Sequence, residues 1–97
     1  MKYRLRPRAE ADLEAIGDYI GKQNRRAALA LIDAFEQRWR LLALYPHSGA
    51  LRDDIGTDVR HVVVGEYLCF YRVGTEAVEI LRVLHGRRNI ERDDIEA

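Results

Sequence analysis

The N-terminal half of the chain alternates apolar and polar positions with the period of an α-helix. The first apolar stripe comprises Ala9, Leu13, Ile16 and Ile20. The second comprises Ala28, Ile32, Phe35, Trp39 and Leu42. These stripes predict two amphipathic helices, the first beginning near Pro7, which suits a first helical turn, and the second capped by Asn24. Because only a few residues join them, we expect the helices to lie antiparallel as a hairpin.

The segments on either side of this hairpin have the pattern of β-strands. We predict strands at 2–6, 58–64, 67–73 and 78–84. Gly65-Glu66 fits a two-residue hairpin turn, and Gly74 marks the next turn. The order strand, helix, helix and three strands predicts an α+β fold, with the helical hairpin on one face of a small, mainly antiparallel sheet. So short a chain leaves the other face partly open, and we expect arginine and tyrosine to line it as a docking surface.

Length and composition predict one small domain over residues 1–97, with 89–97 forming a short acidic helix or a frayed end. The chain has 47% hydrophobic and 33% charged residues, and its 16 basic and 16 acidic side chains give a net charge of zero. This composition is that of a soluble globular protein, and its net charge does not favour nucleic-acid binding by bulk attraction.

The cysteine and histidine content predicts neither a disulfide nor a metal site. Cys69 is the single cysteine, inside an apolar run, and we expect it to be buried. The histidines have no metal-ligand spacing, so we predict no metal and no cofactor. The chain has neither a secretory signal pattern nor a membrane-length apolar run, which predicts a cytoplasmic protein without membrane association.

Cationic side chains concentrate where the last predicted strand ends. Arg82 lies within this strand, and His85, Gly86, Arg87 and Arg88 follow it. Glycine permits a sharp turn there, and guanidinium groups bind anions through paired hydrogen bonds. The segment therefore predicts a site for an anionic partner, which is a phosphate, a nucleic acid or an acidic protein segment.

Two arginines on the earlier strands alternate with apolar residues. Arg60 alternates with Val62 and Val64, and Arg72 occupies a similar position on the next strand. Burying an unpaired guanidinium is costly, so we expect both to meet acidic partners, with Glu79 as one candidate for Arg60.

The histidines carry alternative interpretations. His85 either acts as a general acid–base group or hydrogen-bonds to the backbone at the strand end, and we favour the second role. His61 alternates with Val59 and Val63, which indicates a histidine at the edge of the core.

A last feature is the order of short motifs along nearly the whole chain. They are Tyr3-Arg4-Leu5, Ala11-Asp12-Leu13, Ile16, Tyr19-Ile20, Leu44 to Pro46, Gly49, Arg60, Tyr67, Tyr71-Arg72, Ile80 to His85 and Arg87-Arg88. In this order and spacing the chain resembles toxins of the RelE/ParE superfamily of bacterial type II toxin–antitoxin modules. The resemblance implies a hetero-oligomer in which a cognate, ParD-like antitoxin encoded alongside wraps the toxin and holds it inactive.

The superfamily divides into two activities. ParE-like toxins inhibit DNA gyrase and block replication, and the Leu-His-Gly-Arg-Arg ending after an Ile-Leu-Arg-Val strand resembles this branch. On this interpretation there is no catalytic residue, and DNA is contacted only through gyrase or the antitoxin. RelE-like toxins cut mRNA in the ribosome, and Arg60, Arg82, His85 and Arg87 would then be the candidate catalysts. Two features argue against RNA cleavage. The candidate site has no lysine, because both lysines precede residue 23, and the acidic segment after Arg88 would repel RNA phosphates. A third possibility is a non-toxic, toxin-like protein that binds an antitoxin.

We therefore predict a gyrase-inhibiting toxin whose antitoxin lies along the helical hairpin and the exposed sheet. The antitoxin segment is expected to be acidic or amphipathic. The predicted partner-binding residues are Arg60, Arg72, Arg82, His85, Arg87 and Arg88.

Overall fold

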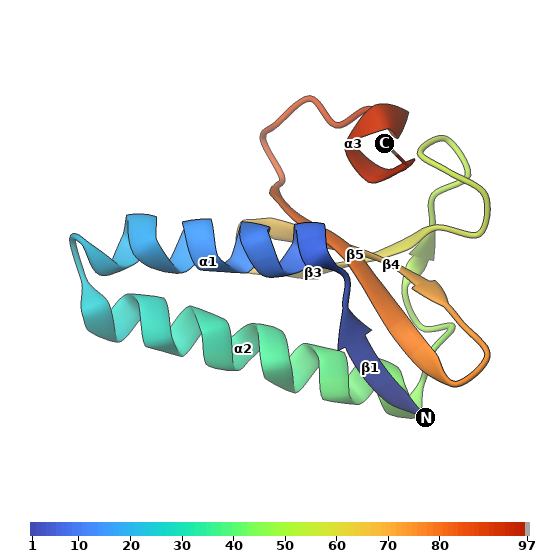
Figure 1. The fold of residues 1–97 in the computed structure, drawn as a ribbon, viewed down its shortest axis with the longest axis horizontal. Coiled ribbons are helices and arrows are strands. Elements are labelled where there is room, and N and C mark those ends of the chain that lie inside the picture. The colour runs from blue at the N-terminus through green and yellow to red at the C-terminus, as the bar shows by residue number, and fades with distance from the viewer. Residues whose placement is uncertain (97) are drawn as a thin grey trace.

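The computed structural model describes residues 1–96 and consists of a five-stranded sheet with a helical hairpin on one face (Figure 1). In chain order the elements are β1 (Lys2–Leu5), α1 (Pro7–Gly21), α2 (Arg25–Leu44), β2 (Ala50–Leu51), β3 (Arg60–Val64), β4 (Tyr67–Val73), β5 (Ala77–His85) and α3 (Arg92–Glu96). The predicted α+β fold and its helical hairpin are confirmed. Ala97, at the end of the predicted tail, lies outside the described residues.

Both long helices begin where the sequence predicts. Pro7 occupies the start of α1, where its missing N–H leaves no hydrogen bond unmade. At the start of α2, the Asn24 side chain accepts a hydrogen bond of 3.0 Å from the Ala27 N–H. Among residues 1–96, no helix combines the length and apolar content required to cross a bilayer.

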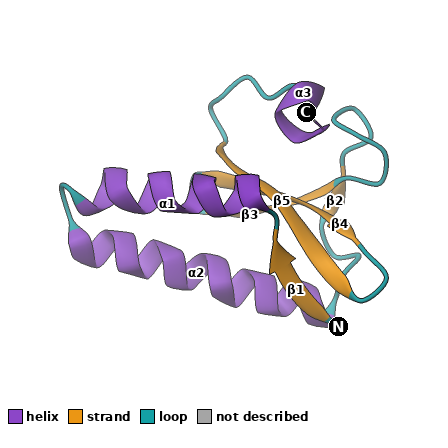
Figure 2. Ribbon diagram, in the orientation of Figure 1, coloured by secondary structure: helices purple, strands orange, loops and turns teal. Residues whose placement is uncertain are grey.

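The sheet has the strand order β1-β5-β4-β3-β2, and Figure 2 shows β1 beside β5. β1 is parallel to β5, and the other neighbouring pairs are antiparallel, so the sheet is mainly antiparallel as predicted. The predicted hairpin turn is confirmed, because Val64 pairs with Tyr67 across a turn in which Gly65 has a φ of 58°. The sequence did not predict β2, whose two residues are too few to show alternation.

The larger core fills the space between the hairpin and the sheet. Its largest side chains are Trp39, Tyr71 and Phe35, each fully buried, and Phe35 and Trp39 belong to the apolar stripe that predicts the second helix. Cys69 is also fully buried there, and burial raises the pKa of its thiol to about 12. Tyr67 and Tyr71 belong to this helix-covered face. The expectation that tyrosines line the open face is therefore wrong.

A second, smaller core covers part of the opposite sheet face. It comprises Ile55, Val59, Phe70, Leu84 and Ile95. The loop before β3 and helix α3 supply the covering residues, and Figure 1 shows both on the side of the sheet away from α2. The tail is thus a short helix packed through Ile95. The expected open face persists toward the β3–β4 turn, where Val63 is 59% exposed.

Candidate functional site

Arg82, one of the predicted partner-binding residues, is engaged inside the molecule. Its guanidinium donates two hydrogen bonds to the Asp12 carboxylate on α1, from Nε at 2.7 Å and from Nη2 at 2.9 Å. A third bond runs from Nη1 to the Asp94 carbonyl in α3. Both charged side chains are largely buried, and the bonds to Asp12 raise the pKa of Arg82. Arg82 therefore joins α1, β5 and α3.

Asp12 has a second role at the edge of the sheet. β5 continues beyond the end of β1. The last hydrogen bond between these two segments runs from the Arg6 N–H to the Ile80 carbonyl. Further along, the Val83 N–H donates to the Asp12 carboxylate at 2.9 Å. An unpaired buried N–H is costly, so this contact stabilises the part of β5 that extends beyond β1. Asp12 lies outside the apolar stripe of α1, so the helical pattern did not predict this internal role.

Arg60 organises the loop between α2 and β2. Its Nη1 donates to the carbonyl of His47 at 3.2 Å and to that of Gly49 at 2.9 Å. Beside it, the Tyr71 hydroxyl donates to the Pro46 carbonyl at 2.7 Å and accepts from the Gly49 N–H at 2.9 Å. A side chain on Gly49 would place its Cβ 2.5 Å from the Tyr71 hydroxyl, so glycine is required there.

Arg72 and Glu79 lie across from each other in the β4–β5 ladder. Arg72 donates from Nε to the Thr57 carbonyl at 2.9 Å, so it contacts the loop of the smaller core. Glu79 is next to Arg4 of β1, with 3.9 Å between the charged groups. The expected pairing of Glu79 with Arg60 is wrong, since Arg60 stands opposite Tyr71 on another strand pair.

A polar cluster that the sequence did not predict lies around Arg52. This arginine donates two hydrogen bonds of 3.0 Å to the Asp54 carboxylate and stands 5.7 Å from the centre of the Phe70 ring. Its Nη1 is 3.3 Å from His61 Nδ1. Burial, together with the charge of Arg52, lowers the pKa of His61. His61 is half-buried against Phe70, in agreement with the prediction of a histidine at the edge of the core.

Three of the predicted partner-binding residues, His85, Arg87 and Arg88, lie near the surface at the end of β5. His85 packs edge-on against Tyr67 at 5.3 Å, and its Nδ1 accepts from the Arg87 N–H at 3.1 Å. The favoured backbone-binding role of His85 is thus confirmed. Its Nε2 lies 3.7 Å from a carboxylate oxygen of Glu66. Arg88 binds the Asp94 carboxylate, whereas the Arg87 guanidinium has no ion-pair or hydrogen-bond partner among the described residues.

The six predicted partner-binding residues therefore form no single surface. His85, Arg87 and Arg88 are together at the end of β5. Arg60 shares the helix-covered face with Tyr71, and Arg72 and Arg82 stand with Phe70 on the opposite face. His85 pairs with Tyr67, and Arg60 pairs with Tyr71. His85 and Arg60 are therefore roughly 13 Å apart along the direction of β4. Within residues 1–96, no cluster of three or more potential ligands is arranged to hold a metal ion.

Comparison with known proteins identifies the family. Residues 3–90 match the sequence profile described as "ParE toxin of type II toxin-antitoxin system, parDE". The chain belongs to the ParE toxin family. "Toxin ParE1" of Caulobacter vibrioides is 33% identical to it over 88 residues, which are 90% of this chain and 91% of the relative. "Toxin RelE2" of the same organism is 37% identical over 81 residues, covering 84% and 90%.

A solved structure supports the ParE-type fold. The structure titled "Chromosomal ParDE TA system from P. aeruginosa" contains a chain with 24% identity and a TM-score of 0.75, covering 88% of this chain and 95% of its own. The family match includes every predicted partner-binding residue and ends just before α3. This toxin therefore combines a ParE-type fold with a C-terminal helix that lies beyond the matched region.

Proposed function

We propose that this ParE-type toxin inhibits DNA gyrase, thereby blocks DNA replication, and is held inactive by a cognate ParD-like antitoxin. Membership of the ParE family supports the toxin role. The observation that favours gyrase inhibition over catalysis is the dispersal of the candidate catalytic side chains. General acid–base chemistry on RNA requires its groups within hydrogen-bonding reach of one phosphodiester.

The ribonuclease candidates fail this geometric requirement in two ways. Arg82 is held by Asp12, and Nη1 of Arg60 is held by two loop carbonyls, so both guanidinium groups are engaged by other parts of the chain. His85 lies at the opposite end of β4 from Arg60. Only His85 and Arg87 are then positioned to act together, which is too small a set for phosphodiester cleavage. Binding without catalysis is the function this arrangement supports best.

We place the gyrase-docking surface at the end of β5. Arg87 is exposed, and its guanidinium has no partner among residues 1–96; Arg88 is beside it, and His85 orders the turn that carries both. In this proposal Arg60, Arg72 and Arg82 contribute indirectly, by fixing the loop after α2, the loop before β3 and the N-terminal half of α1. In this proposal the toxin binds both its target and its antitoxin in the cytoplasm.

A RelE-like activity, the cutting of mRNA in the ribosome, is the second candidate function. The relative named "Toxin RelE2", at 37% identity, is the observation that favours it. The two candidates predict different first effects in a cell, so one experiment separates them.

Pulse-labelling after induction of the toxin alone in a bacterium tests the proposal. Incorporation of labelled thymidine and labelled methionine is followed side by side, with an Arg87→Glu variant and a Glu76→Arg control, both at exposed positions. Gyrase inhibition predicts an early fall in thymidine incorporation while methionine incorporation continues. An early fall in methionine incorporation supports the ribonuclease. If neither falls, the chain is a non-toxic antitoxin-binding protein and the proposal is wrong.

A further inference from the structure

The turn that follows β5, residues 85–88, is held by three hydrogen bonds from its backbone N–H groups. The Gly86 N–H donates to the Glu66 carbonyl at 2.8 Å, and the Arg88 N–H donates to the His85 carbonyl at 3.0 Å. The Arg87 N–H donates to a side chain instead, Nδ1 of His85, at 3.1 Å. Of these three acceptors only the imidazole nitrogen can gain a proton near neutral pH, so the hold on the Arg87 backbone depends on the protonation of His85.

The His85 ring is placed by contacts that do not use Nδ1. It packs edge-on against Tyr67, its partner in the β4–β5 ladder, with 5.3 Å between the ring centres. Its Nε2 lies 3.7 Å from a carboxylate oxygen of Glu66, in the turn between β3 and β4. Because Nδ1 accepts a hydrogen bond, the neutral ring carries its proton on Nε2, the nitrogen nearer to this carboxylate.

Protonation of His85 removes the acceptor of the Arg87 N–H. The second proton binds to Nδ1, and since both nitrogens of an imidazolium are donors, rotation of the ring restores no acceptor. The ring itself keeps its contact with Tyr67, and its new positive charge is attracted by Glu66. The other two hydrogen bonds of the turn have carbonyl acceptors and persist. Proton binding therefore releases the Arg87 backbone and leaves its surroundings in place.

The groups around His85 keep their charge near neutral pH. They are Glu66, Tyr67, Arg87 and Arg88, with Tyr19 of α1 acting on Tyr67 and Asp94 of α3 bound to Arg88. Burial, more than neighbouring charge, raises the pKa of Tyr67, so its hydroxyl stays protonated. A hydrogen bond from the Glu91 N–H lowers the pKa of Asp94, so its carboxylate stays ionised. Among these residues, His85 is the one whose charge changes between about pH 6 and about pH 8.

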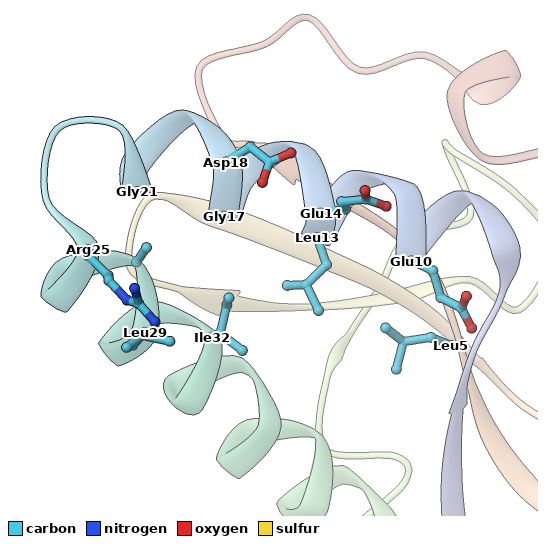
Figure 3. Close-up of a pocket in the computed structure, with 11 residues that line it drawn as sticks. Leu5, Glu10, Leu13, Glu14, Gly17, Asp18, Gly21, Arg25, Leu29 and Ile32 are labelled. Carbon is cyan, nitrogen blue, oxygen red and sulfur yellow. The ribbon is translucent and has the colours of Figure 1, made fainter.

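The groove between α1 and α2 offers no competing source of pH dependence. It has a volume of about 440 Å³, and none of its lining residues is a histidine. Figure 3 shows its charged residues, with Glu10, Glu14 and Asp18 along α1 and Arg25 at the start of α2. Carboxylates and guanidinium groups keep their charge near neutral pH. A response of the toxin to mild acid therefore comes from its histidines.

We propose that His85 is a pH-dependent positioning residue of the gyrase-docking surface. Its neutral ring holds the Arg87 backbone and so directs a guanidinium that has no partner within residues 1–96. Protonation of Nδ1 releases this backbone and weakens docking in mildly acidic solution. The proposal rests on the proposed inhibition of gyrase. Loss of one hydrogen bond predicts about fivefold weaker inhibition at about pH 6 than at about pH 8.

Nuclear magnetic resonance of the toxin alone tests the structural part of the proposal. The backbone amide signal of Arg87 and the ring signals of His85 are followed through a pH titration. We expect both to change with one midpoint, while the amide signal of Gly86 changes much less. In His85→Asn the Arg87 amide signal should stay constant, because asparagine carries an acceptor oxygen on the same carbon as Nδ1 and this oxygen does not titrate. An Arg87 amide that ignores the protonation of His85 would overturn the proposal.

Inhibition of gyrase by matched variants tests the functional part. The ratio of half-inhibitory toxin concentrations at the two pH values is measured for the wild type, His85→Asn, His85→Phe and the control His47→Asn, which changes an exposed histidine elsewhere. We expect the ratio to be about five for the wild type and the control, and about one for both His85 variants. His85→Phe, which keeps a ring but has no acceptor, should be the weaker inhibitor of these two. Thermal unfolding at both pH values checks that each variant is folded.

The two measurements separate failure of this proposal from failure of the proposed function. Equal ratios for wild type and His85→Asn would overturn the positioning role, even where the Arg87 amide follows His85. Absence of inhibition by the folded wild-type toxin at both pH values contradicts the proposed function instead, and the amide titration then still decides whether His85 holds the turn.

Discussion

Replacing Asp12 by alanine tests the link between helix α1 and the end of the sheet. The side chains of Arg82 and Asp12 are only 10% and 15% exposed. Asp12→Ala leaves a largely buried guanidinium with the Asp94 carbonyl as its remaining partner, and it also removes the acceptor of the Val83 N–H. Removing one member of a buried ion pair costs about 3–5 kcal/mol. Since a small domain is stable by about 5–15 kcal/mol, the variant should lose a large share of its folding free energy.

Urea unfolding followed by the fluorescence of Trp39 measures this effect, because the single tryptophan is 1% exposed in the folded core. Glu14→Ala is the matched control on the same helix, and its free energy of unfolding should stay within about 0.5 kcal/mol of the wild type. If Asp12→Ala also fell within about 1 kcal/mol of the wild type, the reasoning about buried charge would be refuted.

Unfolding and toxicity measured on the same variants decide what Arg82 contributes to toxicity. An Arg82→Ala variant should be destabilised about as much as Asp12→Ala, and combining the two should cost less than their sum because they remove one interaction. Loss of toxicity in both single variants, with recovery at lower growth temperature, would assign Arg82 a structural role. Loss of toxicity by a fully stable Arg82→Ala protein would contradict it.

Three further predictions follow from individual contacts. Tyr71→Phe removes the hydroxyl that binds Pro46 and Gly49 and should destabilise the fold by about 1–3 kcal/mol; an unchanged Tm would contradict its role in fixing the loop. The lowered pKa of His61 means that the folded state disfavours its protonation. Stability should therefore be full above the ordinary histidine pKa of about 6.5 and decline as pH falls through it, and His61→Gln should flatten this part of a urea-unfolding pH series. An equally steep decline in the variant would exclude His61 as the cause. Arg87→Glu should leave the free energy of unfolding within about 0.5 kcal/mol of the wild type while weakening gyrase inhibition, and equal potency would remove Arg87 from the docking surface.

The sequence predicted the elements whose local signals agree with their packing. The helical stripe that includes Phe35 and Trp39 matches the buried face of α2, and Asn24 caps it as expected. The Gly65 turn sets the β3–β4 register. At these positions the spacing of apolar residues, the capping side chain and the turn glycine all favour the same local structure.

The features of the fold and the site that the sequence did not predict depend on contacts between segments far apart in the chain. β5 is apolar on both faces, so alternation alone did not assign its Leu84 to a second core or place Phe70 of β4 and Ile95 against it. Asp12 and Arg82 are 70 residues apart, and nothing in the helical pattern separates Asp12 from its acidic neighbours. The cationic segment after β5 was visible as a cluster, but which arginines are held internally depended on tertiary structure.

Incubation of the purified toxin with DNA gyrase, ATP and relaxed plasmid tests the central proposal most directly. The products are resolved after denaturation of gyrase, with the antitoxin-bound toxin as the matched control. The account predicts that supercoiling falls and cleaved plasmid accumulates as the free toxin is added, and that the antitoxin prevents both. Unchanged supercoiling at a large excess of folded toxin, together with cutting of mRNA on ribosomes, would contradict it.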